Sequence, residues 1–255
     1  QILQSLPQAI QTMLDPADCG PACLSLCQDV QGETFEYPEE FFKERVHNIR
    51  RPKPDDFQIK QAVERIKNSK NPIIISGGGV FYSDAMEELS NFAVKHNIPV
   101  TQTVMGYSTM KRDHSHFVGP IGGLGGKAAN NLAKETDLAI CIGTKLADFT
   151  TGSWANFENP QFKLVSINIA RHDANKHLAE AVIGDAKVSL IELSNALGDW
   201  RSSDNWHKKS QDELKSWNEY VDKESGPTNQ DLPSYAHAVG AIYRNSDPTD
   251  IAVTA

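Results

Sequence analysis

Short apolar runs alternate with amphipathic stretches through the middle of the chain. Residues 73–76, 99–102, 138–142, 164–168 and 181–183 are largely β-branched or apolar, which predicts buried strands. Apolar residues at helical spacing predict helices over 56–68, around 86–93, over 125–134 and over 187–197. Continuous apolar strands that alternate with helices are typical of a parallel sheet covered on both faces. The pattern therefore predicts an α/β fold over residues 55–198, with a doubly wound, mostly parallel sheet of about six strands.

The segments on either side of this unit follow other patterns. A short helix is predicted over 4–14, a buried strand over 22–27 and a proline-rich extended connector over 28–54. After residue 198 a polar region predicts a surface helix over 205–223, because Trp206, Leu214 and Trp217 share one helical face. A linker and a helix over 234–244 then lead to an apolar strand at 251–254.

The two outer strands would each join a sheet whose other strands are missing from this sequence. An isolated strand cannot satisfy its backbone groups. We therefore expect residues before about 55 and after about 231 to pack poorly, and we interpret the chain as a middle piece of a larger enzyme.

Composition and charge restrict the classes of partner. Hydrophobic residues make up 39% of the 255 residues, which is enough for a sizeable core. The net charge of −8 and the scattered basic residues argue against a nucleic-acid partner. No apolar run approaches the roughly 18 residues needed to cross a bilayer, so no membrane partner is expected.

The cysteines are interpreted as buried, unpaired thiols rather than as metal ligands. Cys19, Cys23 and Cys27 are spaced by four, but Pro21 opposes a helix there, and Cys141 lies in a predicted strand. His114 and His116 could form half of a metal site, yet no partner cluster lies near them, so exposed histidines and no metal site are expected. Reduced thiols suit the cytoplasm.

Glycine-rich loops follow two of the predicted strands. Gly77, Gly78 and Gly79 stand between a strand and a helix, where glycine lets backbone N–H groups approach a phosphate. A tight strand–helix junction requires the same glycines, and the full G-x-G-x-x-G pattern is absent. Gly122 and Gly123 belong to a second loop of this kind. Because ligands bind at the carboxyl edge of an open parallel sheet, the two loops together make a nucleotide-shaped crevice a reasonable hypothesis.

Two further loop positions are candidates for the same crevice. In the loop after residue 142, Gly143, Thr144 and Asp148 either meet a ligand or cap the turn, and the pattern favours neither. Asn168 ends the fourth predicted strand. The chain carries no G-x-S-x-G, H-E-x-x-H or P-loop motif, which argues against a self-contained hydrolase.

These segments, in this order, resemble the thiamine-diphosphate-dependent enzymes of the acetohydroxyacid synthase and pyruvate oxidase type. Residues 20–30 are similar to the last strand of the pyrimidine-binding domain, G-P-V-x-L-x-x-P-x-D-V, with Cys27 in place of the proline. Residues 71–80 resemble the opening strand and turn of the central domain, and residues 184–186 its closing G-D-A. Asn168 stands where the family strand usually ends in an acid.

The resemblance implies a division of the chain. Residues 1–54 would be the tail of the pyrimidine-binding domain and a connector, and 55–198 a Rossmann-like central domain. Residues 199–231 would be a surface helix and linker, and 232–255 the start of the pyrophosphate-binding domain.

Residues 15–21, 28–33 and 148–154 further resemble the subfamily that hydrolytically opens a cyclic dione in myo-inositol catabolism. This implies a small polyol-derived dione as substrate, thiamine diphosphate and Mg²⁺ as cofactors, and a homodimer or homotetramer for the full-length enzyme. The family's activating glutamate and metal-binding G-D-G motif lie outside this sequence. No residue is therefore assigned as catalytic, and the chain alone is expected to be inactive and to bind no thiamine diphosphate.

Two alternatives remain for the central unit itself. It could bind an FAD- or ADP-type nucleotide in the crevice, or it could be purely structural in another thiamine-diphosphate-dependent synthase or decarboxylase. Asn168 favours the structural interpretation, because an acid suits a ribose hydroxyl better than an amide does.

Overall fold

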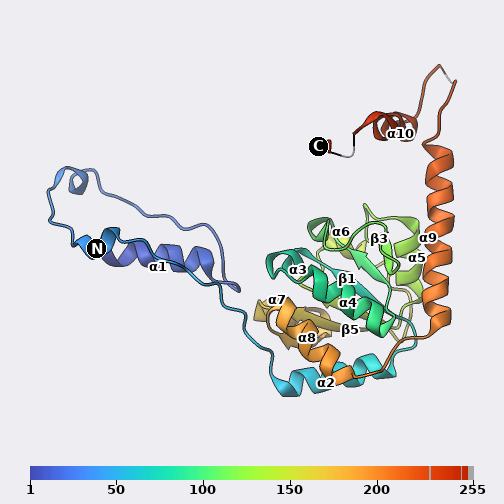
Figure 1. The fold of residues 1–255 in the computed structure, drawn as a ribbon, viewed down its shortest axis with the longest axis horizontal. Helices are drawn as coiled ribbons and strands as arrows, with labels where there is room; N and C mark the ends of the chain where they lie inside the picture. Colours follow the sequence, from blue (N-terminus) through green and yellow to red (C-terminus); the bar gives the residue numbers. More distant parts are fainter. Residues whose placement is uncertain (230, 248, 252–255) are drawn as a thin grey trace.

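A single parallel sheet forms the centre of the molecule. The computed structural model describes residues 1–229, 231–247 and 249–251. Its sheet has six strands in the order β3-β2-β1-β4-β5-β6, and every neighbouring pair is parallel (Figure 1). The strands are β1 Pro72–Ser76, β2 Val100–Gln102, β3 Phe117–Pro120, β4 Leu138–Ile142, β5 Lys163–Asn168 and β6 Glu180–Ile183.

Helices cover both faces of the sheet, as the alternation of strands and helices predicts. One face carries α2 Asp56–Asn68, α4 Met86–His96 and α8 Ala186–Leu197, and the other carries α5 Lys127–Glu135 and α9 Asp204–Glu224. Ile74 and Ile140 point into the first layer, whereas Ile73 and Cys141 point into the second, because successive strand residues face opposite sides. The predicted doubly wound α/β fold is confirmed.

Short elements complete the chain. The carboxyl ends of β1, β4 and β5 lead into α3 Gly78–Tyr82, α6 Asp148–Thr151 and α7 Arg171–Ala174. The 3₁₀ turns are η1 Val30–Gly32, η2 Glu39–Phe42, η3 Val104–Gly106 and η4 Lys176–Leu178. The outermost helices are α1 Ile2–Leu14 and α10 Tyr235–Asn245.

The structure adds one strand and one short helix to the elements that the sequence pattern identifies. Sequence patterns identify five of the strands individually and miss β3, whose four residues include a glycine and a proline and pair with β2 through a register shift between Val100 and Thr101. The short helix is α3, which ends before Ser83, and the predicted helix around 86–93 is α4, which begins at Met86 after Ala85 without a side-chain cap.

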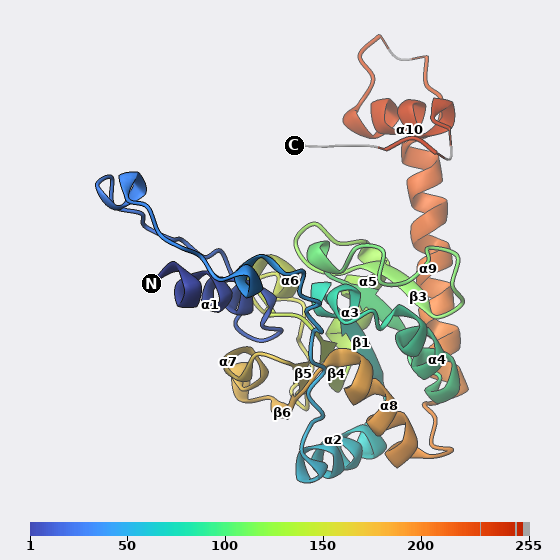
Figure 2. The same ribbon diagram turned by 60° about the vertical axis from the view of Figure 1, so that its left-hand side comes forward.

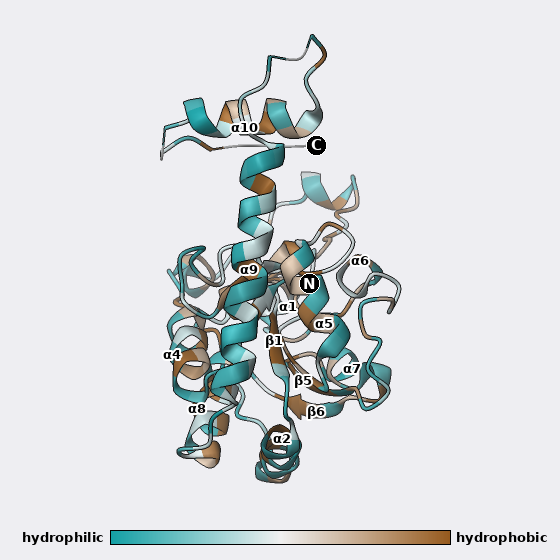
Figure 3. Ribbon diagram, turned by 90° about the vertical axis from the view of Figure 1, so that its right-hand side faces the viewer, coloured by the Kyte–Doolittle hydropathy of each residue, from teal (hydrophilic) through white to brown (hydrophobic). Residues whose placement is uncertain are grey.

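The flanking segments extend away from the sheet. Residues 1–53 contain no buried residue, and α1 projects as an arm with its following loop (Figures 1 and 2). On the other side, α9 passes beyond the sheet and leads to α10; its residues are mostly hydrophilic (Figure 3). Sparse packing of residues 1–53, and of the described residues after 231 with only Gly240 buried, agrees with the expectation from sequence. The division at residues 54, 198 and 231 stays a prediction.

Two predictions for the N-terminal arm are wrong in this structure. Residues 22–27 form no strand, and Cys19, Cys23 and Cys27 are exposed rather than buried. The physical reason is that no neighbouring strand lies beside this segment to satisfy its backbone groups. Cys141 is buried as predicted, and burial raises the pKa of its thiol. The strand predicted at 251–254 falls outside the described residues except for Ile251.

Candidate functional site

A crevice lies at the carboxyl edge of the sheet, where the strand order reverses between β1 and β4. From β1 the chain proceeds outward to β2 and β3, and from β4 it proceeds outward to β5 and β6 on the other side. The cavity there has a volume of about 460 Å³. It is lined by the turns that follow β1, β2, β4, β5 and β6. In an open α/β sheet this switch point is the usual place for a ligand.

The structure brings only part of the predicted site residues to this cavity. Gly78, Gly79, Gly143, Thr144 and Asn168 line it. The other predicted site residues do not line it: Gly77, Gly122, Gly123 and Asp148. The five residues that line the cavity lie at the carboxyl ends of β1, β4 and β5 or in the turns that follow them, and these three strands are neighbours in the sheet.

The first glycine turn packs against the turn after β4, backbone to backbone. The Gly77 N–H donates to the Ile142 carbonyl at 2.8 Å, and the Gly79 N–H donates to the Gly143 carbonyl at 2.9 Å. A Cβ atom on Gly79 would lie 2.5 Å from the Gly143 Cα. These glycines therefore permit a close junction, and the two N–H groups are not free for a phosphate. The helix that follows, α3, has only five residues, which limits its dipole.

The second glycine loop is also occupied by protein contacts. The Gly122 N–H donates to the Asn130 Oδ1 at 2.9 Å, and the Gly123 N–H donates to the Phe149 carbonyl at 2.7 Å. A Cβ on Gly122 would approach the Phe149 carbonyl to 2.0 Å. This loop thus holds α5 and α6 together at the edge of the sheet and contributes no lining to the cavity.

Asn168 uses its amide to join two turns. Its Nδ2 donates to the Thr144 carbonyl at 3.1 Å, and its Oδ1 accepts from the Ala170 N–H at 2.9 Å. A carboxylate could accept from Ala170 but could not donate to Thr144. The amide at this position therefore has a structural explanation. Asp148 is exposed, lies outside the cavity and accepts a hydrogen bond from the Ser153 hydroxyl at 3.2 Å.

Sequence patterns did not identify the N-terminal wall of the crevice. Pro16, Ala17 and Cys19 line the cavity together with Lys145 and Asp173. Contacts across more than a hundred residues cannot be inferred from periodicity.

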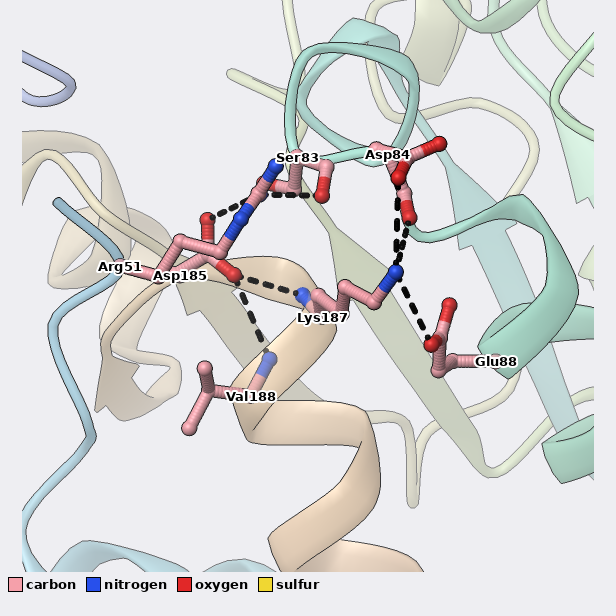
Figure 4. Close-up of polar contacts among 7 residues, drawn as sticks. All are labelled: Arg51, Ser83, Asp84, Glu88, Asp185, Lys187 and Val188. Carbon is pink, nitrogen blue, oxygen red and sulfur yellow. Dashed lines mark hydrogen bonds and ion pairs between the residues drawn. The ribbon is translucent and has the colours of Figure 1, made fainter. Parts of the chain in front are cut away.

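Arg50 and Arg51 form the polar contacts at the end of the N-terminal arm, next to the crevice. The Arg50 guanidinium lies 3.6 Å from the Asp15 carboxylate at the start of the wall. Arg51 donates to the Ser83 carbonyl and pairs with Asp185 at 3.1 Å (Figure 4).

Asp185 has a second role as the cap of α8. It accepts from the backbone N–H groups of Lys187 at 3.0 Å and Val188 at 3.3 Å. Lys187 in turn reaches Asp84 and Glu88 on the neighbouring elements (Figure 4). The G-D-A turn at residues 184–186 therefore stabilises the start of α8 and holds the connector at Arg51.

The histidine cluster of the second face is packed rather than exposed, which corrects the expectation for His116. His116 is buried, stacks on His207 with ring centroids 4.2 Å apart, and contacts the Asn97 Oδ1 through Nε2 at 3.2 Å. Burial, with nearby positive groups, lowers the pKa of His116 to about 4. The rings are therefore neutral near pH 7 and help to dock α9.

The described residues show no cluster of side chains that could hold the metal ion of a metal-anchored diphosphate. No three His, Cys, Asp or Glu side chains converge into a metal site within the described ranges. The glycine N–H groups Gly77, Gly79, Gly122 and Gly123 are already bonded to protein atoms. The absence of thiamine diphosphate binding by this chain stays a prediction, and no chemical step is assigned to that cofactor here. Among the residues that the structure describes, no helix has the length and apolar character needed to cross a bilayer.

Comparison with known families identifies a class of protein to which this parallel α/β fold belongs. The family described as thiamine pyrophosphate enzyme, central domain, matches residues 59–193, more than half of the chain. The chain belongs to this family.

Individual curated proteins similar to this chain carry more specific names than the family does. The chain is 42% identical over 223 residues to the 3D-(3,5/4)-trihydroxycyclohexane-1,2-dione hydrolase of Clostridium perfringens (strain 13 / Type A), covering 86% of this chain and 34% of that protein. The similarly named protein of Clostridium botulinum (strain Alaska E43 / Type E3) is 43% identical over 215 residues, which cover 84% and 33%. That of Bacillus cereus (strain ZK / E33L), hydrolase 1, is 44% identical over 205 residues, which cover 80% and 32%. The chain spans about a third of the length of the curated relatives it matches.

Proposed function

We propose that this chain is the central part of a thiamine-diphosphate-dependent hydrolase. The full-length enzyme would open the ring of trihydroxycyclohexane-1,2-dione to a 5-deoxyglucuronic acid in myo-inositol degradation. The observation that carries this proposal is the identity of 42–44% to the hydrolases named above, which extends beyond the central-domain match at residues 59–193. Thiamine diphosphate, when bound in the full-length enzyme, supplies an electron sink for carbon–carbon cleavage.

Within that enzyme, this chain would act as a scaffold and would contribute no catalytic residue. Three features support a structural crevice: the N–H groups of Gly79 and Gly143 bond to protein, the Asn168 amide bonds to both neighbouring turns, and the described residues lack a metal-binding cluster. The role of the central unit is then to hold the flanking segments at a fixed distance through contacts such as Arg51 with Asp185.

The cavity volume of about 460 Å³ keeps an FAD- or ADP-type nucleotide as the alternative ligand. Such a ligand would bind through exposed side chains at the rim, including Tyr82 and Met105, rather than through the glycine N–H groups. This alternative would also suit a related synthase or decarboxylase.

Calorimetric titration of residues 1–255 tests the division of roles. We expect no binding of thiamine diphosphate with Mg²⁺, and no binding of FAD or ADP. Micromolar binding of thiamine diphosphate would refute the scaffold proposal, and micromolar binding of a nucleotide would support the alternative instead.

The full-length protein that contains this chain should convert the cyclic dione when thiamine diphosphate and Mg²⁺ are supplied. Conversion is measured as formation of the ring-opened acid by mass spectrometry. Absence of conversion, with decarboxylation or condensation of pyruvate in its place, would assign the chain to another enzyme of the same family. We further propose a homodimer or homotetramer in the cytoplasm with no nucleic-acid or membrane partner, which light scattering and cell fractionation would test.

A further inference from the structure

A second cavity lies at the opposite edge of the sheet from the crevice. Its volume is about 340 Å³, within the range of small-molecule sites. It forms where β5 and β6 begin, with contributions from α2, the loop after α6 and η4. Strands β5 and β6 lie close to α7 (Figure 2). The proposed scaffold role does not assign a function to this second cavity.

One wall of this second cavity is aromatic. Trp154 and Phe162 line it, and Phe157 connects them, with ring centroids 5.7 Å from Trp154 and 4.5 Å from Phe162. The His177 ring meets Trp154 edge-on at 4.6 Å. Flat apolar surfaces of this kind favour a planar ring as occupant.

The charged residues of the cavity leave an excess of positive charge. Arg65 pairs with Glu180, the two charged atoms lying 3.6 Å apart. Lys163 also lines the cavity, and its ammonium group has no carboxylate partner among the described residues. An anionic group on the occupant would complement Lys163.

The backbone around the cavity is strained on two sides. Ser153 and Trp154 have φ values of 54° and 69°, and His177 and Leu178 have 59° and 57°. These left-handed conformations cost free energy in residues that carry a side chain, and they cluster at binding sites more than elsewhere. Leu178 is also fully exposed, so its side chain gains nothing from burial in the free protein. An occupant that covers Leu178 would account for both features.

We propose that this cavity binds a planar aromatic ring carrying one anionic group. The ring lies between Trp154 and Leu178, and the anionic group faces Lys163. An aromatic carboxylate and a nucleoside monophosphate share this chemistry. The site is separate from the crevice at the carboxyl edge and does not depend on the proposed hydrolase function.

Ligand-detected NMR on residues 1–255 tests the site with four probes. Indole-3-carboxylate and AMP each carry a ring and an anion, adenosine lacks the anion, and ribose 5-phosphate lacks the aromatic ring. We expect at least one of the first two to bind with a Kd of about 1 mM or below, and the last two to bind at least about tenfold more weakly. Binding by AMP alone identifies a nucleotide, and binding by indole-3-carboxylate alone identifies an aromatic acid. Equal binding of adenosine, or no binding of either anionic ring, would overturn the proposal.

Two variants with matched controls locate the binding. Lys163→Gln should weaken the binding of the anionic probe about tenfold, equivalent to ~1.4 kcal/mol. Lys208→Gln on α9 should leave the affinity for that probe unchanged. Leu178→Gly should weaken binding by about fivefold without lowering the melting temperature, because glycine adopts the left-handed conformation freely. The exposed Leu232→Gly is its control. Equal affinity of Lys163→Gln and the wild type would place the probe elsewhere and refute the site.

Discussion

Replacement of Gly79 by alanine tests whether the first glycine turn serves a junction or a ligand. The added methyl carbon would lie 2.5 Å from the Gly143 Cα and 3.1 Å from the Gly143 carbonyl oxygen. Carbon atoms in contact prefer a separation of about 3.5–4.0 Å, so the turns after β1 and β4 must move apart by about 1 Å. Both atoms belong to the backbone, and no side-chain rotation can relieve the contact.

The expected loss of stability follows from three contributions. Overpacking costs about 1–3 kcal/mol, and loss of the hydrogen bond from Gly79 to the Gly143 carbonyl costs about 0.5–1.5 kcal/mol. Alanine favours the helical conformation of α3 by about 1 kcal/mol. The net effect of Gly79→Ala is therefore a decrease of about 2 kcal/mol in the free energy of unfolding.

Urea unfolding of residues 1–255, followed by circular dichroism, measures this difference. In thermal unfolding the same loss lowers the melting temperature by about 4–8 °C for a domain of this size. Gly123→Ala is the matched control, because its Cβ would meet no atom closer than 3.8 Å and stability should change by about 0.5 kcal/mol or less. A Gly79→Ala variant as stable as the wild type would refute the junction, and it would favour a glycine kept for ligand approach.

Three further predictions concern the polar contacts of the fold. His116 should make the folded chain less stable as the pH drops from about 6.5 to about 4, because burial lowers its pKa to about 4 in the folded chain, so the unfolded chain binds more protons there. His116→Gln should reduce this pH dependence in unfolding experiments at several pH values, whereas exposed His47→Gln should not. Asn168→Asp should lower the unfolding free energy at pH 7 by about 2–3 kcal/mol, because the carboxylate cannot donate to the carbonyl after β4; an unchanged urea midpoint would contradict this. Asp185→Ala should lower the free energy of unfolding by about 2 kcal/mol, because α8 loses its cap and Arg51 loses its partner. Arg51→Gln should lower it by about 1 kcal/mol or less, because the arginine is partly exposed. Equal losses of the two variants in thermal unfolding would contradict this assignment.

The regular part of the fold could be predicted from the sequence because its information is local. The continuous apolar runs at 73–76 and 138–142 indicate strands covered on both faces, and the helical spacing over 56–68 indicates α2. Parallel pairing follows from the helix between successive strands. The short strand β3 carries only four residues, with Gly119 and Pro120 among them, and its own pattern resembles a loop.

The crevice illustrates what only the tertiary structure decided. The sequence identified glycine turns at the carboxyl edge of the sheet, and for the first turn it slightly favoured a strand–helix junction over a phosphate site without excluding either. The partners of the turn are distant: Gly79 donates to Gly143, and Asn168 donates to Thr144. Pro16 and Cys19 reach the same cavity from the N-terminal arm. Local sequence determines which backbone conformations are accessible, whereas the hydrogen-bond partner of a turn is set by which strands become neighbours in the folded sheet.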